Sequence, residues 1–116
     1  MEHAARGARA AGGLTIGLLP GDDPDDANPY IDVAVATSMG HGRNAILART
    51  ADGVVAIGGG LGTLSEIALA LRNRKPTIGL QTWRFDRDGR TEPELPIAAT
   101  PKDALEWLFT HLDPTA

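Results

Sequence analysis

Four glycines fall within the five positions 58–62, between an apolar run and a helical pattern. The apolar residues 53–57 precede them, and residues 67–71 follow with the spacing of a helix, which predicts a strand, a glycine turn and a helix start. Glycine permits positive φ and close approach of a ligand to the backbone. Because the first N–H groups of a helix are free and its dipole favours negative charge, this turn predicts a phosphate-binding site.

Strand and helix patterns alternate along the rest of the chain. Short apolar runs predict strands at residues 14–19, 31–36, 53–58 and 76–80, with an edge strand near 95–99. Helical patterns predict helices at 1–11, 41–50, 63–74 and from Pro101 onward, and Gly12 supplies a stop for the first of them. Alternating elements indicate an α/β fold with a parallel sheet flanked by helices. With 116 residues, we expect a single domain spanning residues 1–116.

The composition indicates which partners and which cellular compartment to expect. The net charge of -4 gives no electrostatic basis for binding nucleic acid, so no nucleic-acid partner is expected. No apolar run approaches the roughly 20 residues of a membrane span, so no membrane partner is expected either. The chain has no cysteine, which excludes disulfides and thiolate metal sites and suits the cytoplasm.

The acidic and histidine residues form no metal-ligand pattern. Four aspartates lie within residues 22–26, but their spacing differs from that of an EF-hand and prolines interrupt or flank them. We interpret this segment as a solvated acidic loop. His3, His41 and His111 are widely spaced along the chain, so no metal site is predicted.

Glu66 has two interpretations that the spacing alone leaves open. If Thr63 is the N-cap of the helix, Glu66 stands where a capping-box carboxylate folds back onto the N-cap N–H. The alternative is a functional carboxylate beside the bound phosphate. One carboxylate cannot fully serve both roles.

Arg43 lies directly before the helical pattern at residues 41–50. A cation at a helix start is disfavoured by the helix dipole, so its presence indicates an anionic partner. That partner is either a ligand phosphate or a carboxylate such as Glu66. The alternative interpretation is a solvated surface arginine.

The glycine turn resembles a known family motif. Residues 59–66 are similar to the Gly-Gly-x-Gly-Thr-x-x-Glu motif of the lysine decarboxylase-like Rossmann proteins, which include the LONELY GUY phosphoribohydrolases and the molybdenum cofactor carrier proteins. The segments 28–30 (Asn-Pro-Tyr), 37–40 (Thr-Ser-Met-Gly) and 43–44 (Arg-Asn) also match, in order and spacing, a carrier-like branch of uncharacterised bacterial and archaeal members. The resemblance runs from residue 1 to about residue 80.

The resemblance implies a Rossmann-like fold and assigns roles to the site. In the phosphoribohydrolases, the motif glutamate and an upstream arginine are the catalytic pair, which releases base and ribose 5-phosphate from a nucleoside 5′-monophosphate. Carried over by motif, that pair is Arg43 and Glu66. The phosphate would be held by Gly58, Gly59, Gly60, Gly62 and Thr63. The resemblance implies neither a metal nor a resident cofactor.

Two departures from the hydrolase pattern favour binding over hydrolysis. The hydrolases have proline where this chain has Gly58, and lysine where it has Asn44. Both changes lean toward the carrier-like branch. The alternative function is therefore a non-catalytic carrier of a phosphorylated cofactor such as molybdopterin, and an inactive structural remnant is a third interpretation.

Family members usually begin with a strand, a glycine loop, a helix and a second glycine loop that ends in Gly-Val-Met. Met1 falls on that methionine, so the resemblance implies a domain that is N-terminally truncated relative to the family. Without those strands, the strands at residues 14–19 and 53–58 would have unpaired edges, which invite pairing with another chain. Related proteins are commonly dimers, and we expect a homodimer.

Overall fold

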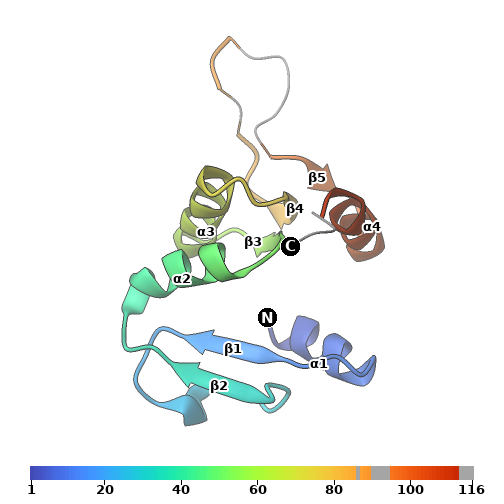
Figure 1. The fold of residues 1–116 in the computed structure, drawn as a ribbon. Coiled ribbons are helices and arrows are strands. Elements are labelled where there is room, and N and C mark those ends of the chain that lie inside the picture. The colour runs from blue at the N-terminus through green and yellow to red at the C-terminus, as the bar shows by residue number, and fades with distance from the viewer. Residues whose placement is uncertain (86, 90–94, 113–116) are drawn as a thin grey trace. The chain divides into compact units, whose positions relative to one another are not determined.

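The computed structural model describes residues 1–85, 87–89 and 95–112. Contacts within the chain divide it into two compact units, Met1–Arg43 and Asn44–Ala116. They are called the N-terminal unit and the C-terminal unit, and each is described by itself (Figure 1). The single domain expected from the sequence stays a prediction.

The N-terminal unit contains one helix and one pair of parallel strands. Helix α1 spans Glu2–Ala10, and strands β1 and β2 span Ile16–Leu19 and Val33–Ala36. In the parallel pair, Ile16 lies opposite Val33. The strands predicted at residues 14–19 and 31–36 are confirmed with slightly shorter bounds. Short 3₁₀ turns occur at Pro24–Asp26 and Gly40–Gly42.

One face of this strand pair carries exposed apolar side chains. Ile16 is 57% exposed and Val33, its partner in the register, is 45% exposed. Val35 follows on the same face, because side chains of a strand alternate, and it is 40% exposed. Burial of this face therefore contributes little to the stability of the strand pair.

Helix α1 ends where the sequence predicted a glycine stop. Gly12 has a φ of +87°, and its N–H donates to the carbonyl of Arg9 at 3.0 Å. The N–H of Gly13 donates to the carbonyl of Ala8 at 2.8 Å. These two bonds form a Schellman motif, in which glycine adopts the left-handed conformation without steric cost.

The C-terminal unit is built on three parallel strands. Their order is β3-β4-β5, with bounds Val54–Gly58, Thr77–Thr82 and Ile97–Ala98. Helices α2, α3 and α4 span Arg43–Thr50, Leu61–Arg72 and Pro101–His111, so α2 begins on the last residue of the N-terminal unit. The predicted strands at 53–58 and 76–80 and the three predicted helices are confirmed.

Two apolar clusters cover the two faces of this sheet. One contains Val55 and the other contains Ala56, and the side chains of neighbouring strand residues point to opposite faces. On the α3 side, buried Ala56, Ile67 and Leu95 pack with Leu71, Trp83, Phe85 and Ile97. On the α4 side, buried Ile78, Leu80, Ala98 and Ala104 pack with Val55 and Trp107. Figure 1 shows α3 and α4 on opposite sides of the strands. Three aromatic side chains thus take part in this packing, namely Trp83, Phe85 and Trp107.

Among the described strands, every one except β4 has an unpaired edge, and β1 and β3 are among them. Within the described part of the chain, β1 pairs with β2 alone and β3 pairs with β4 alone. These are the strands for which the resemblance implied unpaired edges. Open edges leave a row of backbone donors and acceptors available to another strand.

Candidate phosphate-binding site

The glycine turn (residues 58–62) connects β3 to α3 as predicted. Strand β3 ends at Gly58, whose φ of +90° favours glycine over every other residue. Gly59, Gly60 and Gly62 lie beside open space, because no described atom would come within 4 Å of a Cβ built on them. Packing against the described residues therefore does not require these three glycines, and the space beside the turn is open.

The start of α3 is suited to an anion. Gly60 is the N-cap, no side chain caps the helix within the described residues, and its first turn contains no acidic residue. The helix begins at Leu61, and the N–H of Leu64 makes the first helical bond, to the carbonyl of Gly60 at 3.1 Å. The N–H groups of Leu61, Gly62 and Thr63 precede that bond and are the donors that a phosphate would accept from.

The capping-box interpretation of Glu66 is wrong. The N-cap is Gly60, and Thr63 already lies inside the helix, so Glu66 is too far along α3 to reach back to the N-cap N–H. The glycine-rich segment is itself able to start the helix, which shifts the boundary from residue 63 to Leu61. The half-exposed carboxylate of Glu66 therefore stands one turn beyond the phosphate donors without a capping role.

Two side chains hydrogen-bond to the backbone of the glycine turn. The sequence analysis predicted this role for neither of them. The indole Nε1 of Trp83 donates to the carbonyl of Gly60 at 3.1 Å. Asn44, which is only 1% exposed, donates from Nδ2 to the carbonyl of Gly62 at 3.4 Å. Asn44 stands where the hydrolases carry lysine. The family motif Arg43-Asn44 was the one sequence feature that pointed to a role for this residue.

Arg43 binds backbone at the carboxyl end of β1. It opens α2, is half-buried, and its Nη1 donates to the carbonyl of Leu18. The interpretation of Arg43 as a solvated surface arginine is therefore wrong. Arg43 belongs to the N-terminal unit and Glu66 to the C-terminal unit, so their action as a catalytic pair stays a prediction.

Loops at the carboxyl ends of β1 and β2 also fold against each other. The Thr37 hydroxyl donates to the carbonyl of Leu19 at 2.7 Å, and the Ser38 N–H donates to that of Gly21 at 2.9 Å. Ser38 has a φ of +55°, an uncommon conformation outside glycine. Ligands of open α/β sheets bind at the carboxyl ends of the strands, which is the end where both this loop and the glycine turn lie in their own units.

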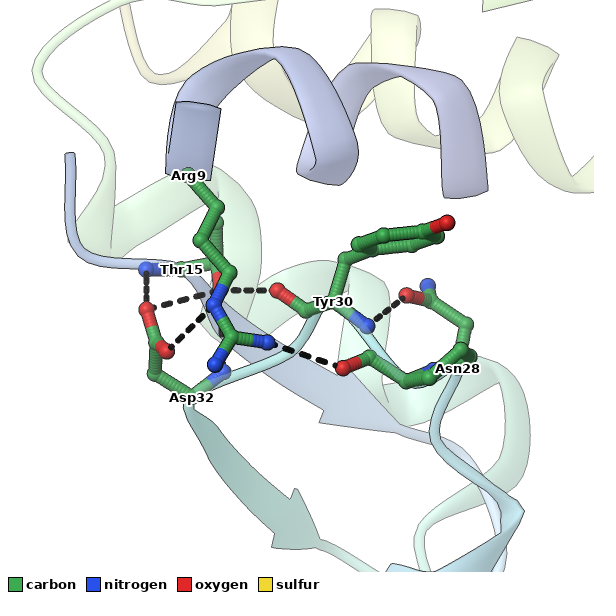
Figure 2. Close-up of polar contacts among 6 residues, drawn as sticks. Arg9, Thr15, Asn28, Tyr30 and Asp32 are labelled. Atoms are coloured by element: carbon green, nitrogen blue, oxygen red, sulfur yellow. Dashed lines mark hydrogen bonds and ion pairs between the residues drawn. The ribbon is translucent and has the colours of Figure 1, made fainter. Parts of the chain in front are cut away.

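A polar cluster fastens the opposite, amino-terminal ends of β1 and β2 (Figure 2). Thr15 N–H donates to Asp32 Oδ2 at 2.9 Å, and Asp32 N–H donates to the Thr15 hydroxyl at 2.9 Å. That hydroxyl has one proton, which lies within reach of the Tyr30 carbonyl and of Asp32 Oδ2. Arg9 adds an ion pair to Asp32 at 3.5 Å and a hydrogen bond to the carbonyl of Pro29 at 3.0 Å.

This cluster is called the Asp32 clamp and consists of Arg9, Thr15, Tyr30 and Asp32. Hydrogen bonds from the backbone and then the side chain of Thr15 lower the pKa of Asp32, Arg9 lowers it further, and burial opposes the shift. The segment 28–30 matched the family motif, and the Asn28 side chain accepts from the Tyr30 N–H at 2.9 Å. That segment therefore contributes to the clamp, at the end of β1 and β2 opposite to the loops that follow these strands.

Among residues 1–85, 87–89 and 95–112, no group of three or more His, Cys, Asp or Glu side chains could hold a metal ion. Within the same ranges, no helix is long and apolar enough to cross a membrane.

Parallel strands, flanking helices and a glycine turn at a strand end define a Rossmann-like α/β protein. The chain belongs to the SLOG cluster4 family, whose sequence profile matches residues 1–105. This confirms the family resemblance found in the motifs.

Two similar solved structures bind or carry the same cofactor. The molybdenum cofactor binding protein of the phototrophic bacterium Rippkaea orientalis is 39% identical, with a TM-score of 0.78 over 95% of this chain and 69% of that one. The molybdenum cofactor carrier protein of Chlamydomonas reinhardtii is 31% identical, with a TM-score of 0.71 over 92% of this chain and 69% of that one.

An uncharacterized protein of Archaeoglobus fulgidus is 43% identical over 81 residues. The match covers 70% of this chain and 53% of that protein, so the chain spans about half the length of this relative.

Proposed function

We propose that this protein binds a phosphorylated cofactor of the molybdenum-cofactor type at the glycine turn and acts in the cytoplasm as its carrier. One observation carries the proposal: α3 starts without a side-chain cap or an acidic first turn, beside open space at Gly59, Gly60 and Gly62. That arrangement suits a phosphate. Its occurrence in a chain similar to two molybdenum cofactor proteins supports the choice of ligand.

Asn44 favours the carrier over the hydrolase. A lysine at this position would bring a mobile cation to the site, whereas Asn44 is buried and its carboxamide binds the backbone at Gly62. The position is therefore used to hold the turn. A carrier needs a rigid phosphate cradle and no proton transfer.

The second candidate is hydrolysis of the N-glycosidic bond of a nucleoside 5′-monophosphate. The half-exposed Glu66, which does not cap α3, supports it because a carboxylate near the ribose could orient water. Arg43 would be its partner, as the family motif implies. Incubation with nucleoside 5′-monophosphates and chromatography for free base tests this candidate, and Glu66→Gln should abolish any release.

Gly62→Ala tests the phosphate site itself. The added methyl group meets no described atom and lies in a helix, so the fold should be retained, while the methyl group intrudes on a phosphate at the turn. Gly7→Ala is the matched control, since Gly7 also lies in a helix with nothing near its Cβ position. Calorimetric titration with anaerobically prepared molybdenum cofactor should show weaker binding for Gly62→Ala only. Equal affinity in both variants would place the site elsewhere.

We also propose that the protein forms a homodimer. Ile46 of α2 and Leu61 of α3 are 36% and 77% exposed, and the open edges of β1 and β3 offer a further pairing surface. Light scattering at micromolar concentration should give twice the chain mass. A cooperatively melting monomer would contradict this proposal.

A further inference from the structure

Strand β4 has a bulge beside the glycine turn. Ile57 pairs with Leu80, but the next residue of β3, Gly58, pairs with Thr82. Gln81 is therefore an extra residue opposite the point where β3 enters the turn. Residues 80–82 are called the β4 bulge. Bulges of this kind redirect side chains and are frequent next to functional sites.

Gln81, the extra residue of the bulge, has a strained backbone conformation. Its φ is +51°, its side chain is exposed, and it lies in a strand. Arg74, with a φ of +59°, provides the contrast. Arg74 stands just after α3, where Schellman hydrogen bonds to Leu71 and from Lys75 to Ala70, each 3.0 Å, explain its conformation. A glycine would serve Gln81 better if the backbone alone mattered.

Neighbouring residues are adapted to the bulge. A Cβ on Gly79 would come within 2.7 Å of Thr82 Cγ2 and 2.8 Å of Ile97 Cδ1, so only glycine leaves room for the redirected Thr82. The hydroxyl of Thr82 is buried and has no hydrogen-bond partner among the described residues. An unpaired buried hydroxyl destabilises the fold. The bulge is therefore retained at a cost to stability.

Trp83 connects the bulge to the phosphate donors. It follows Thr82 directly, and its indole donates to the carbonyl of Gly60, the N-cap of α3. The bulge and the glycine turn are thus joined twice, through the β3–β4 pairing and through Trp83. Gln81 is held at a fixed place next to the turn.

We propose that Gln81 is the specificity-determining residue of the ligand site and that its carboxamide reads the heterocyclic ring of the phosphorylated cofactor. The inference rests on the proposed function. A carboxamide presents one acceptor and two donors side by side, which matches the donor-and-acceptor edge of a fused nitrogen heterocycle. The glycine turn binds the phosphate, which many metabolites share, and Gln81 selects among them.

Gln81→Gly separates this role from a purely structural one. Glycine accepts the positive φ, so the bulge and the fold are retained or stabilised while the carboxamide is lost. Arg74→Gly is the matched control, because it relieves the same backbone strain away from the turn. Both are titrated calorimetrically with anaerobic molybdenum cofactor, which carries the ring, and with inorganic phosphate, which does not.

Loss of the carboxamide should weaken cofactor binding about tenfold, the effect of one or two hydrogen bonds, and leave the affinity for phosphate unchanged. Arg74→Gly should change neither. Gln81→Met keeps the side-chain length and removes both hydrogen-bonding groups, so it should repeat the result if Gln81→Gly does not fold.

Wild-type cofactor affinity in a folded Gln81 variant would overturn the specificity role and leave the proposed function standing. An equal loss of phosphate and cofactor would also overturn it, because the defect would then lie in the turn. If the wild-type protein binds neither probe, both the proposed function and this inference fail.

Discussion

The β1–β2 pair and the β3–β4 pair are both parallel, yet they are stabilised in different ways. The first exposes Ile16 and Val33 on one face and is fastened at its amino-terminal ends by the Asp32 clamp. The second is covered on both faces by apolar clusters that include Ile67, which is fully buried. Side-chain hydrogen bonds add to the backbone pairing of the first pair, and burial of apolar surface adds to that of the second.

The contrast shows two ways in which short parallel strands are stabilised. Parallel pairs normally lie buried between helices, and their strands are uniformly apolar for that reason. The strands β1 and β2 have such apolar sequences but expose one apolar face, so the side-chain bonds of the Asp32 clamp should matter more for their stability. We therefore expect core substitutions to act mainly through the C-terminal unit and polar substitutions mainly through the N-terminal unit.

The largest effect is expected for Ile67→Ala. Ile67 is 0% exposed, so truncation should leave a cavity and lower the free energy of unfolding by about 2–5 kcal/mol. Ile16→Ala is the control from the other pair, and as Ile16 is 57% exposed, its cost should be about 0.5 kcal/mol or less. Urea denaturation followed by circular dichroism measures both. Similar losses for the two variants would remove the contrast between the strand pairs.

A smaller effect is expected for Thr15→Val in the clamp. Thr15 is only 7% exposed, and valine has nearly the same shape. The substitution removes the hydroxyl that accepts from the Asp32 N–H and donates to the Tyr30 carbonyl. Leaving these partners unpaired should cost about 1–2 kcal/mol in the same urea assay. Thr50→Val, at an exposed helix end, is the control. A neutral Thr15→Val would show that backbone pairing alone fixes the register of β1 and β2.

Acid should weaken the clamp in a defined direction. The pKa of Asp32 is lower in the folded protein than in the unfolded chain, so the stability it contributes is present above the unfolded pKa and is lost as pH falls through the folded one. The loss should therefore begin below about pH 4. Asp32→Asn should show less of this decline than wild type in thermal melts at successive pH values. An unchanged acid profile would contradict the assigned role of Asp32.

The smallest change in the free energy of unfolding is expected for substitutions at the C-terminal ends of α1 and α3. Both helices end in a Schellman motif, but the left-handed position is Gly12 in one and Arg74 in the other. Arg74→Gly should raise the free energy of unfolding by about 0.5–1 kcal/mol, and Gly12→Ala should lower it by a similar amount. Thermal melts of the two variants should shift in opposite directions. A shift of the same sign would mean that these caps do not decide the stability of the helix ends.

Sequence patterns predicted the helices and strands that are determined by residues close together in the chain. The apolar runs, the glycine turn and the stop at Gly12 depend on neighbouring residues, so the strands and helices came within a few residues of their true bounds. The start of α3 was misplaced because Thr63 and Glu66 imitate a capping box, whereas the glycine segment before them begins the helix at Leu61. Local patterns of this kind cannot rank two competing N-caps.

Contacts between residues that are far apart in the chain could not be predicted from the sequence. The bulge at Gln81 depends on the pairing register of β3 and β4, and the bond from Trp83 to Gly60 joins residues 23 positions apart. The bond from Thr15 to Asp32 likewise spans 17 positions. The glycine turn was predicted as a phosphate site from its residues, but its supports became visible only when distant segments were placed side by side.

The bond between Trp83 and Gly60 also has an optical consequence. Indole fluorescence responds to hydrogen bonding at Nε1 and to nearby charge, and this indole is bonded to Gly60, the N-cap of α3 at the proposed phosphate site. The other tryptophan, Trp107, stacks on His111 with ring centroids 4.0 Å apart and belongs to α4. Replacing Trp107 by Phe would leave Trp83 as the single tryptophan, so excitation of the indole would report on occupancy of the glycine turn without an attached dye.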